Sequence, residues 1–157
     1  MTNNFFIRPV RMNECNLVTD LIRGIAEYEK LSDQVEATPE KLYQALFVDK
    51  TCKAVIGFEN EKPVGFALYF YNFSTFKAKK GLYLEDLFIK EPYRHNGYGK
   101  QFFLYLIQEA KQENCGRMEW TCLDWNTKAI AFYNSLKAKP MDEWTVFRLD
   151  EKDFERF

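Results

Sequence analysis

The chain has 157 residues, of which 46% are hydrophobic and 29% charged, and its 22 basic residues against 23 acidic ones give a net charge of −1. This length suits one domain with a substantial core, and the balanced charge argues against a nucleic-acid or membrane-surface binder, which normally has a basic excess. We therefore expect a single domain over residues 1–157 that binds neither nucleic acid nor a membrane.

Cysteine and histidine are too sparse for a metal centre. The four cysteines, at positions 15, 52, 115 and 122, form no CxxC pair, and His95 is the only histidine. These counts favour buried free thiols in a reducing compartment and exclude a multi-histidine metal site. No segment has the pattern of a signal peptide or the length of a transmembrane helix. We expect a soluble cytoplasmic protein without a bound metal.

The first fifty residues predict a strand followed by two helices. FFIRPV at 5–10 has the composition of a short strand, and apolar residues at helical spacing predict a helix over about 14–31. A second helix is expected over 37–47, because Thr38 is a natural N-cap and Pro39 suits the first helical position.

The middle of the chain predicts a hairpin and a buried strand. The β-rich runs at 52–58 and 63–71 are joined by a polar segment, which is typical of an antiparallel hairpin. The basic segment FSTFKAKKG at 73–81 is expected to be a loop, and LYLEDLFI at 82–89 to be a central strand that is apolar on both faces except for two adjacent acids.

The last third predicts a helix containing residues 103–110, a strand at 117–123, a helix at 125–136 and a closing strand at 143–150. The complete order is β-α-α-β-β-β-α-β-α-β. It indicates an α+β domain built on one central sheet.

The segment EPYRHNGYGKQFF at 91–103 leads from the predicted central strand through two glycines into a helix. A helix N-terminus attracts anions, and glycine lets the backbone approach a phosphate closely. The residues do not fit a P-loop or a dinucleotide fingerprint. What remains is R-x-x-G-x-G, formed by Arg94, Gly97 and Gly99. On the residues alone, an anion site and a simple turn both remain open.

Several segments in this order resemble the GNAT superfamily of N-acetyltransferases, and within it the diamine (spermidine/spermine-type) N-acetyltransferase branch. The resemblance covers nearly the whole chain and is carried by FIRPV, YEK, VGFALYF, LYLEDLFI followed by YRHNGYGK, and LDWNTKAIAFYNSL. It implies the GNAT (acyl-CoA N-acyltransferase) fold, with one mixed, mostly antiparallel sheet flanked by helices. It also implies a homodimer that transfers the acetyl group of acetyl-CoA to a primary amine of a small cationic substrate, such as a diamine, a polyamine or a lysine-like amine.

The resemblance implies that acetyl-CoA binds along the central strand, the glycine loop and a later helix. The loop matches the family signature Q/R-x-x-G-x-G/A, whose backbone amides hold the pyrophosphate, and the strand pairs with the pantetheine arm. The implied cofactor-binding residues are Leu87, Phe88, Ile89, Arg94, His95, Asn96, Gly97, Tyr98, Gly99, Lys100, Asn126, Thr127, Lys128, Ala129 and Tyr133.

Two residues match the family's catalytic groups. An amine is mostly an ammonium in water and must lose a proton before it attacks the thioester. Glu85 matches the proposed base, acting through a water, and Tyr133 matches the acid that protonates the leaving thiolate. On the residues alone, Glu85 could instead be a structural carboxylate and Tyr133 a core residue. Because Glu85 and Asp86 are adjacent on a strand, we expect them to face opposite sides of the sheet.

The resemblance also implies an amine pocket that is rich in acids. The implied substrate-binding residues are Tyr28, Glu29, Glu85, Asp86, Glu119, Trp120, Thr121 and Glu143. The chain departs from polyamine-specific members at YNFSTFKAKKG, which supplies no acid and brings Lys77, Lys79 and Lys80. We therefore expect short diamines or lysine-like amines to be preferred over long polyamines. Lys137 replaces the glycine that usually ends the later helix.

Two alternatives remain. The chain could acetylate an amino acid or an exposed protein amine, or it could be a non-catalytic sensor that binds acyl-CoA. The presence of Glu85, Asp86 and Tyr133 together argues against the sensor.

Overall fold

The structure is a computed structural model, and it describes residues 3–157. The chain forms two compact units, which meet in the sequence between Thr121 and Cys122, and each unit is described by itself. The prediction of one domain over residues 1–157 stays a prediction.

The first unit is built on one five-stranded sheet with the order β1-β2-β3-β4-β5. Neighbouring strands are antiparallel except for β4 and β5, which are parallel. The strands are β1 (Phe5–Pro9), β2 (Lys53–Glu59), β3 (Lys62–Ser74), β4 (Lys79–Ile89) and β5 (Arg117–Glu119). The sheet is mixed and mostly antiparallel, which confirms the α+β prediction.

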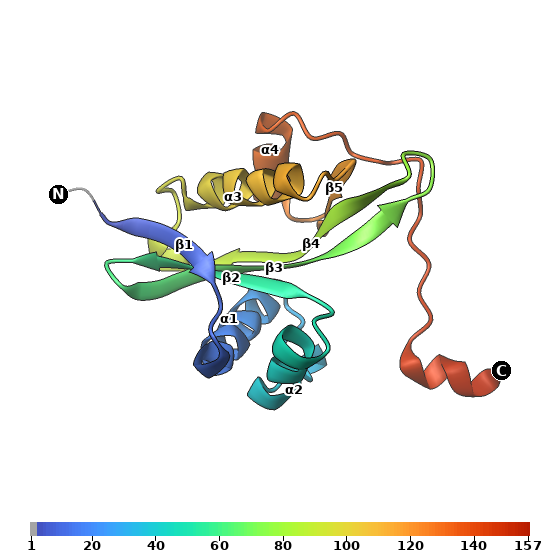
Figure 1. Cartoon of the computed structure of the whole chain (residues 1–157), viewed down its shortest axis with the longest axis horizontal. Coiled ribbons are helices and arrows are strands. Elements are labelled where there is room, and N and C mark those ends of the chain that lie inside the picture. Colours follow the sequence, from blue (N-terminus) through green and yellow to red (C-terminus); the bar gives the residue numbers. More distant parts are fainter. Residues whose placement is uncertain (1–2) are drawn as a thin grey trace. The chain divides into compact units, whose positions relative to one another are not determined.

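Helices cover both faces of this sheet. Figure 1 shows α1 (Cys15–Tyr28) and α2 (Pro39–Tyr43) on one face and α3 (Tyr98–Gln112) on the other. The predicted start of α2 is confirmed: Oγ1 of Thr38 accepts a hydrogen bond of 3.2 Å from the Lys41 N–H, and Pro39 takes the first position. A π-helical turn at Gln44–Val48 continues α2.

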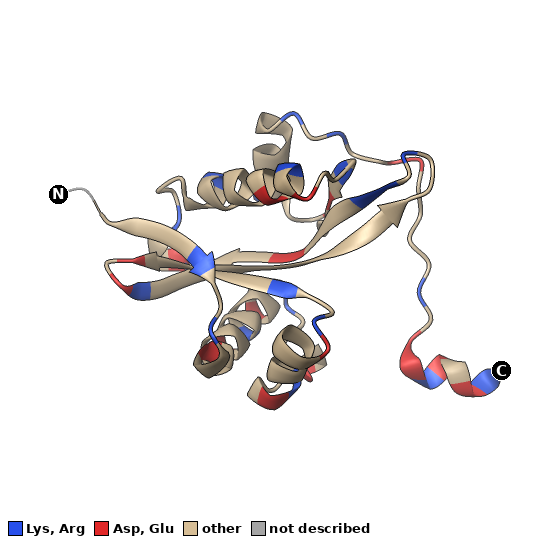
Figure 2. Ribbon diagram, viewed as in Figure 1, with Lys and Arg blue, Asp and Glu red and all other residues tan. Residues whose placement is uncertain are grey.

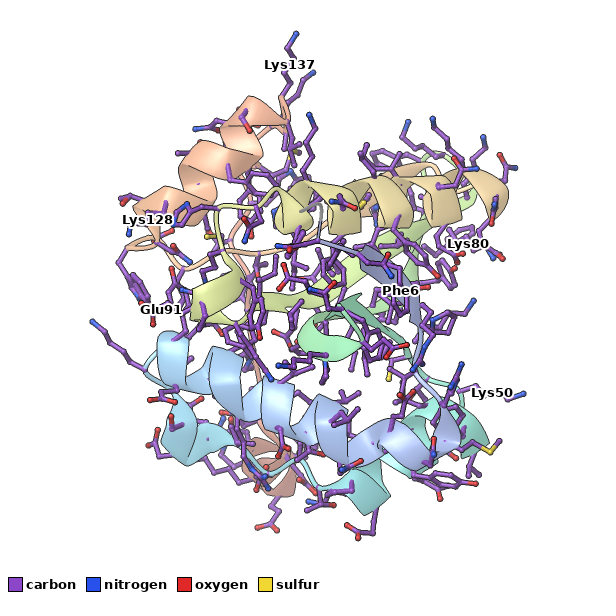
Figure 3. All side chains as sticks on the ribbon, turned by 90° about the vertical axis from the view of Figure 1, so that its left-hand side faces the viewer. Phe6, Lys50, Lys80, Glu91, Lys128 and Lys137 are labelled. Carbon is purple, nitrogen blue, oxygen red and sulfur yellow. The ribbon has the colours of Figure 1, made fainter. Side chains whose placement is uncertain are left out.

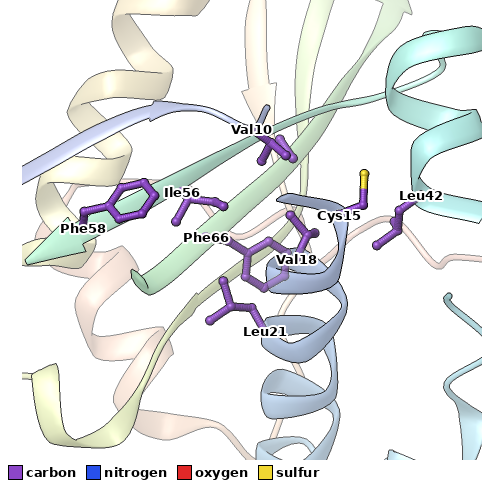
Figure 4. Packing of buried hydrophobic residues seen from close by; sticks show 9 residues of the cluster. Val10, Cys15, Val18, Leu21, Leu42, Ile56, Phe58 and Phe66 are labelled. Carbon is purple, nitrogen blue, oxygen red and sulfur yellow. The ribbon is translucent and has the colours of Figure 1, made fainter. Parts of the chain in front are cut away.

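The core between α1 and the sheet fixes the position of α1. Val18 and Leu21 on α1 pack with Ile56 and Phe66 of the sheet, and all four side chains are buried (Figure 4). Farther along α1, a Cβ atom at Gly24 would lie 2.6 Å from Cε1 of the Phe88 ring. Glycine is therefore required for this close approach of α1 to β4.

The predicted loop at 73–81 is wrong over most of its length. β3 continues to Ser74 and β4 begins at Lys79, so that only residues 75–78 form the turn. The strands pair with each other to the end of the hairpin, from Tyr71 opposite Leu82 to Ser74 opposite Lys79. The segment is polar because most of it is exposed at the end of the sheet. It still forms strands, because its backbone N–H and C=O groups form hydrogen bonds with the other strand of the hairpin.

The second unit contains α4 (Thr127–Ser135) and a 3₁₀ turn at Glu151–Arg156. The predicted helix is confirmed, whereas the strand predicted at 143–150 is wrong, because residues 145–150 have no regular structure. Trp144 and Phe147 in this segment are 75% and 92% exposed. A β-rich sequence shows that a segment is able to form a strand, but a strand also needs a partner to pair with. In the part of the chain described here, no strand pairs with residues 145–150.

β5 is also shorter than predicted, since it ends at Glu119 rather than near residue 123. No helix within residues 3–157 is both long and apolar enough to cross a membrane.

Candidate active site

The two acids of β4 lie at a β-bulge. Leu68 of β3 is opposite Asp86, whereas the next residue, Tyr69, is opposite Leu84, so Glu85 is the extra residue of β4. The expectation that Glu85 and Asp86 face opposite sides assumed unbroken alternation, which the bulge interrupts. Glu85 is exposed and Asp86 is half-buried.

Negative charge gathers around Asp86. Burial, followed by the charges of Glu85 and Glu29, raises the pKa of Asp86 to about 6. Glu29 follows the last residue of α1, and burial raises its pKa as well. Within residues 3–157, none of these three carboxylates forms an ion pair. Figure 2 shows the acidic position in the middle of β4. A set of acids without basic partners suits a cationic ligand.

One edge of β4 is open beside these acids. β5 pairs with β4 only at Gly81–Tyr83, and no other strand of the described chain takes this edge from Leu84 to Ile89. Unpaired backbone groups on such an edge can bind an extended ligand as an added strand. This arrangement fits the role expected for Leu87, Phe88 and Ile89 beside a pantetheine arm.

The glycine loop has the geometry of an anion site. After a 3₁₀ turn at Glu91–Tyr93, the chain enters α3 through left-handed conformations at His95 (φ 67°) and Gly97 (φ 79°). Nδ2 of Asn96 donates a hydrogen bond of 3.0 Å to the Tyr93 carbonyl and shapes the turn. A Cβ atom at Gly97 would have no neighbour within 4 Å, so open space adjoins the backbone there. The residues present therefore fit a pyrophosphate group at the α3 N-terminus.

Tyr98 can serve this site only through its backbone. Its side chain is buried, the ring stacks on Phe5 with centroids 3.9 Å apart, and its hydroxyl donates a hydrogen bond to Glu59. Gly99 and Lys100 follow in the first turn of α3, where backbone N–H groups have no partner within the helix.

Arg94 packs on aromatic rings. Its Nε donates a hydrogen bond of 2.8 Å to the Ile89 carbonyl. Its Cζ lies 4.8 Å from the centroid of the Tyr28 ring and 5.6 Å from that of Phe88. Arg94 thus contacts both an expected amine-pocket residue and an expected cofactor residue.

The end of β5 contributes a paired acid. Arg117 Nε lies 3.0 Å from Glu119 Oε1, so the charge of Glu119 is already compensated. The Trp120 ring packs edge-on against Phe103, with centroids 4.9 Å apart, and Thr121 is exposed. Among the expected pocket acids of this unit, Glu29, Glu85 and Asp86 are the uncompensated ones.

Lys79 and Lys80 have partners of their own. Lys80 pairs with Glu113, and Nζ of Lys79 donates a hydrogen bond of 3.3 Å to Asn114 at the end of α3. Lys79 is six positions before Glu85, a distance of about 20 Å along a strand. In Figure 3, Lys80 lies on the opposite side of the view from Glu91, which precedes the glycine loop. Within one chain, Lys79 and Lys80 therefore lie too far from Glu85 to repel a polyamine that binds beside it.

The remaining candidates lie in the second unit, on or near α4. Oδ1 of Asn126 accepts a hydrogen bond of 3.3 Å from the Ala129 N–H and caps α4, whose first turn includes the exposed Thr127 and Lys128. The Tyr133 ring is half-buried and lies 5.8 Å from the Phe132 ring.

The same unit contains the two other positions singled out in the sequence. Glu143 is exposed and lies outside α4. Lys137 adopts the left-handed conformation (φ 60°) despite its side chain. Two backbone bonds hold it there, from the Lys137 N–H to Asn134 (2.9 Å) and from the Ala138 N–H to Tyr133 (3.2 Å). This pattern is a Schellman motif, in which glycine is more usual.

The close packing at Gly24 and the bulge at Glu85 were not predicted from the sequence. A glycine inside a helix costs stability, so its presence in the predicted first helix signals close packing. The bulge left no signal in the sequence. Within residues 3–157, no group of three or more His, Cys, Asp or Glu side chains could hold a metal ion.

Comparison with known proteins extends these observations. Residues 19–137 match the model of the acetyltransferase (GNAT) family. The chain is 32% identical over 156 residues to the thialysine N-epsilon-acetyltransferase of Bos taurus, covering 92% of this chain and 91% of that protein. It is 44% identical over 85 residues to the L-ornithine N5-acetyltransferase NATA1 of Arabidopsis thaliana, a match to 54% of this chain that spans only 37% of that protein.

Solved structures share the fold. An integron cassette protein from the mobile metagenome of V. cholerae superposes with a TM-score of 0.81 at 25% identity, covering 97% of this chain and 96% of that one. An aminoglycoside acetyltransferase from an uncultured soil sample has a TM-score of 0.79 at 17% identity, with 93% and 95% covered, and shows the fold alone. With a family match over more than half of its length, the chain belongs to the acetyltransferase (GNAT) family.

Proposed function

We propose that the chain is an N-acetyltransferase that moves the acetyl group of acetyl-CoA directly to a primary amine of a small cationic substrate, of lysine-like or short diamine type. The observation that carries the proposal is the group of three uncompensated carboxylates, Glu29, Glu85 and Asp86, beside an open edge of β4. Relatives named for thialysine and ornithine acetylation support the substrate class.

In this proposal two of the carboxylates bind the substrate and the third acts as the base. Glu29 and Asp86 hold the incoming ammonium, because charge-assisted hydrogen bonds replace the water that it loses. Exposed Glu85 removes the proton through a water, and the freed amine nitrogen attacks the thioester carbonyl carbon. The carbon–sulfur bond then breaks, and the Tyr133 hydroxyl protonates the departing thiolate. The attacking nitrogen then gives its second proton to the Tyr133 phenolate, which restores the phenol. The ammonium thus loses two protons, one to solvent through Glu85 and one that replaces the proton given to the thiolate.

The acetyl donor would use the glycine loop and β4. The open space at Gly97, with the N–H groups of the first turn of α3, suits the pyrophosphate, and the open edge at Leu87–Ile89 suits the pantetheine amides. Bound there, acetyl-CoA supplies an activated acyl group.

The test is a thiol-release assay with acetyl-CoA and a panel of amines at one ionic strength. Thialysine, ornithine and putrescine should release thiol more efficiently than spermine, and Tyr133→Phe should lower turnover by roughly 10²-fold while keeping the ring. A lysine-containing peptide tests the protein-amine alternative. If calorimetry shows that acetyl-CoA binds but no amine causes release of the CoA thiol, the chain would instead be a non-catalytic acyl-CoA sensor. A tenfold preference for spermine would overturn the substrate assignment.

We further propose that the protein is a homodimer in which the C-terminal segment contacts a second copy. Trp144, Phe147 and Phe157 are 75%, 92% and 94% exposed, a large apolar exposure for residues so close in sequence. Sedimentation equilibrium should give twice the chain mass, and Phe147→Asp should lower the apparent mass. A wild-type monomer at micromolar concentration would contradict the proposal.

A further inference from the structure

We propose that Arg94 is a positioning residue that joins the amine pocket to the acetyl-CoA loop, rather than a direct ligand of the phosphates. The inference rests on the proposed function and concerns how the two halves of that site are held together. Its basis is the set of contacts that the Arg94 side chain makes with Tyr28, Phe88 and Ile89.

On one side, Arg94 reaches the end of α1. Its guanidinium carbon lies 4.8 Å from the centroid of the Tyr28 ring, and Tyr28 immediately precedes the pocket acid Glu29. Gly24, one turn earlier on α1, lets that helix pack directly on Phe88, the second ring near Arg94. Arg94 therefore completes the packing that fixes the position of Glu29 relative to β4.

On the other side, Arg94 begins the glycine loop. Its Nε–H holds the carbonyl of Ile89, the last residue of β4, at 2.8 Å, and its own N–H donates a hydrogen bond of 3.2 Å to Glu91. The next residue, His95, is in the left-handed conformation that opens the anion site. A shift of this loop is thus transmitted through Arg94 to Tyr28.

The guanidinium does not neutralise the pocket. Within residues 3–157, Arg94 forms no ion pair, and the pKa of Asp86 is raised by acids and burial without an opposing contribution from Arg94. An arginine can stack on aromatic rings and still donate from Nε, which a lysine cannot reproduce. The side chain thus fixes the pocket geometry and leaves the acids charged for the substrate.

Two substitutions separate positioning from phosphate binding. In Arg94→Gln the amide nitrogen occupies the chain position of Arg Nε and can still donate to Ile89, but the charge is lost. In Arg94→Lys the charge remains, but that donor and the planar group are lost. For a positioning residue, both variants should raise the amine KM more than the acetyl-CoA Kd, because both lose the guanidinium group that contacts Tyr28. For a phosphate ligand, acetyl-CoA affinity should fall more in Arg94→Gln than in Arg94→Lys.

We expect Arg94→Lys to raise the amine KM about tenfold, the scale of a lost stacking contact and hydrogen bond, with a smaller change in the acetyl-CoA Kd measured by calorimetry. The amine KM is measured at saturating acetyl-CoA, and circular dichroism checks folding of each variant. Arg23→Lys is the matched control, since Arg23 is an exposed arginine of α1 that contacts Asp20. It should leave both constants unchanged.

A double-mutant cycle with Tyr28→Leu tests the route of the effect. If Arg94 acts through Tyr28, the double variant should have nearly the amine KM of the worse single variant, whereas independent effects would multiply. Unchanged amine KM in Arg94→Lys, multiplied effects in the double variant, or a larger loss of acetyl-CoA affinity in Arg94→Gln would overturn the inference. Wild-type protein that releases no thiol with any amine would instead count against the proposed function, while the calorimetric ranking of the two Arg94 variants would still decide the phosphate role.

Discussion

The two halves of β4 have opposite electrostatic arrangements. In the first half, Lys80 pairs with Glu113 of the α3 end region, and both edges of the strand are paired at Gly81–Tyr83. In the second half, Asp86 is beside acids without basic partners, and one edge has no strand partner among the described residues. Figure 2 shows the basic and acidic positions along this strand.

The charges in the first half of β4 are paired within the fold, whereas those in the second half are left unpaired and are available to a ligand. Lys80 has a carboxylate partner, whereas burial and neighbouring acids raise the pKa of Asp86, and its charge destabilises the folded protein when no cation opposes it. The presence of an uncompensated acid at position 86 indicates a function, because the protein would be more stable with a neutral residue there. Within β4, the proposed binding site lies in the half that ends at the glycine loop.

The largest expected effect comes from neutralising the acids. Glu85→Gln should lower kcat by roughly 10²-fold, because the amine then lacks its proton acceptor, whereas Asp86→Asn should mainly raise the amine KM. Steady-state kinetics with a lysine-like amine measure both constants. Lys80→Met, in the other half of β4, is the control and should leave kcat and KM nearly unchanged. Equal losses in all three variants would remove the functional distinction between the halves.

The next effect concerns stability. Because the pKa of Asp86 is raised to about 6, the folded state binds a proton more tightly than the unfolded state does, and the free energy of unfolding falls as pH rises from about 4 through 6. At pH 7.5, Asp86→Asn should therefore be more stable than wild type by no more than about 3 kcal/mol, and the gain should disappear near pH 3.5. Urea titrations at the two pH values measure the difference. A gain that does not depend on pH would rule out the charge as its cause.

The smallest effect has the opposite dependence on pH. A hydrogen bond from Lys80, and then its charge, lower the pKa of Glu113, so this pair stabilises the fold above the ordinary glutamate pKa and loses its effect as pH falls through the lowered value. Lys80→Met should lower the thermal midpoint slightly at pH 7.5, since exposed pairs contribute little. Scanning calorimetry should find no such difference in strong acid. A larger difference in acid than at neutral pH would contradict this assignment.

Local signals in the sequence predicted much of the fold. Thr38 and Pro39 marked the start of α2, and Gly97 marked the entry to α3, because capping and left-handed conformations depend on residue type. The strand predicted at 143–150 failed because pairing depends on a partner that the segment itself does not specify.

The candidate site was predictable in residue type more than in geometry. The resemblance implied Glu29, Glu85 and Asp86 as pocket residues, and the structure adds that the charges of Glu85 and Glu29 raise the pKa of Asp86. The bulge at Glu85 depends on the register between β3 and β4, which no short pattern in β4 encodes. The partners of Lys79 and Lys80 come from a segment more than thirty residues away in the sequence, so their pairing could not be predicted from the lysine-rich segment itself.

The open edge of β4 also bears on solubility. Unpaired strand edges can template pairing with another molecule, and charges on the edge oppose it because a second copy would bring the same charges close. Glu85 and Asp86 lie near the start of the segment from Leu84 to Ile89, where their charges would oppose such pairing. An enzyme redesigned for a neutral substrate by removing both acids would lose this protection, and its storage would need a ligand that covers the edge or a new charge nearby.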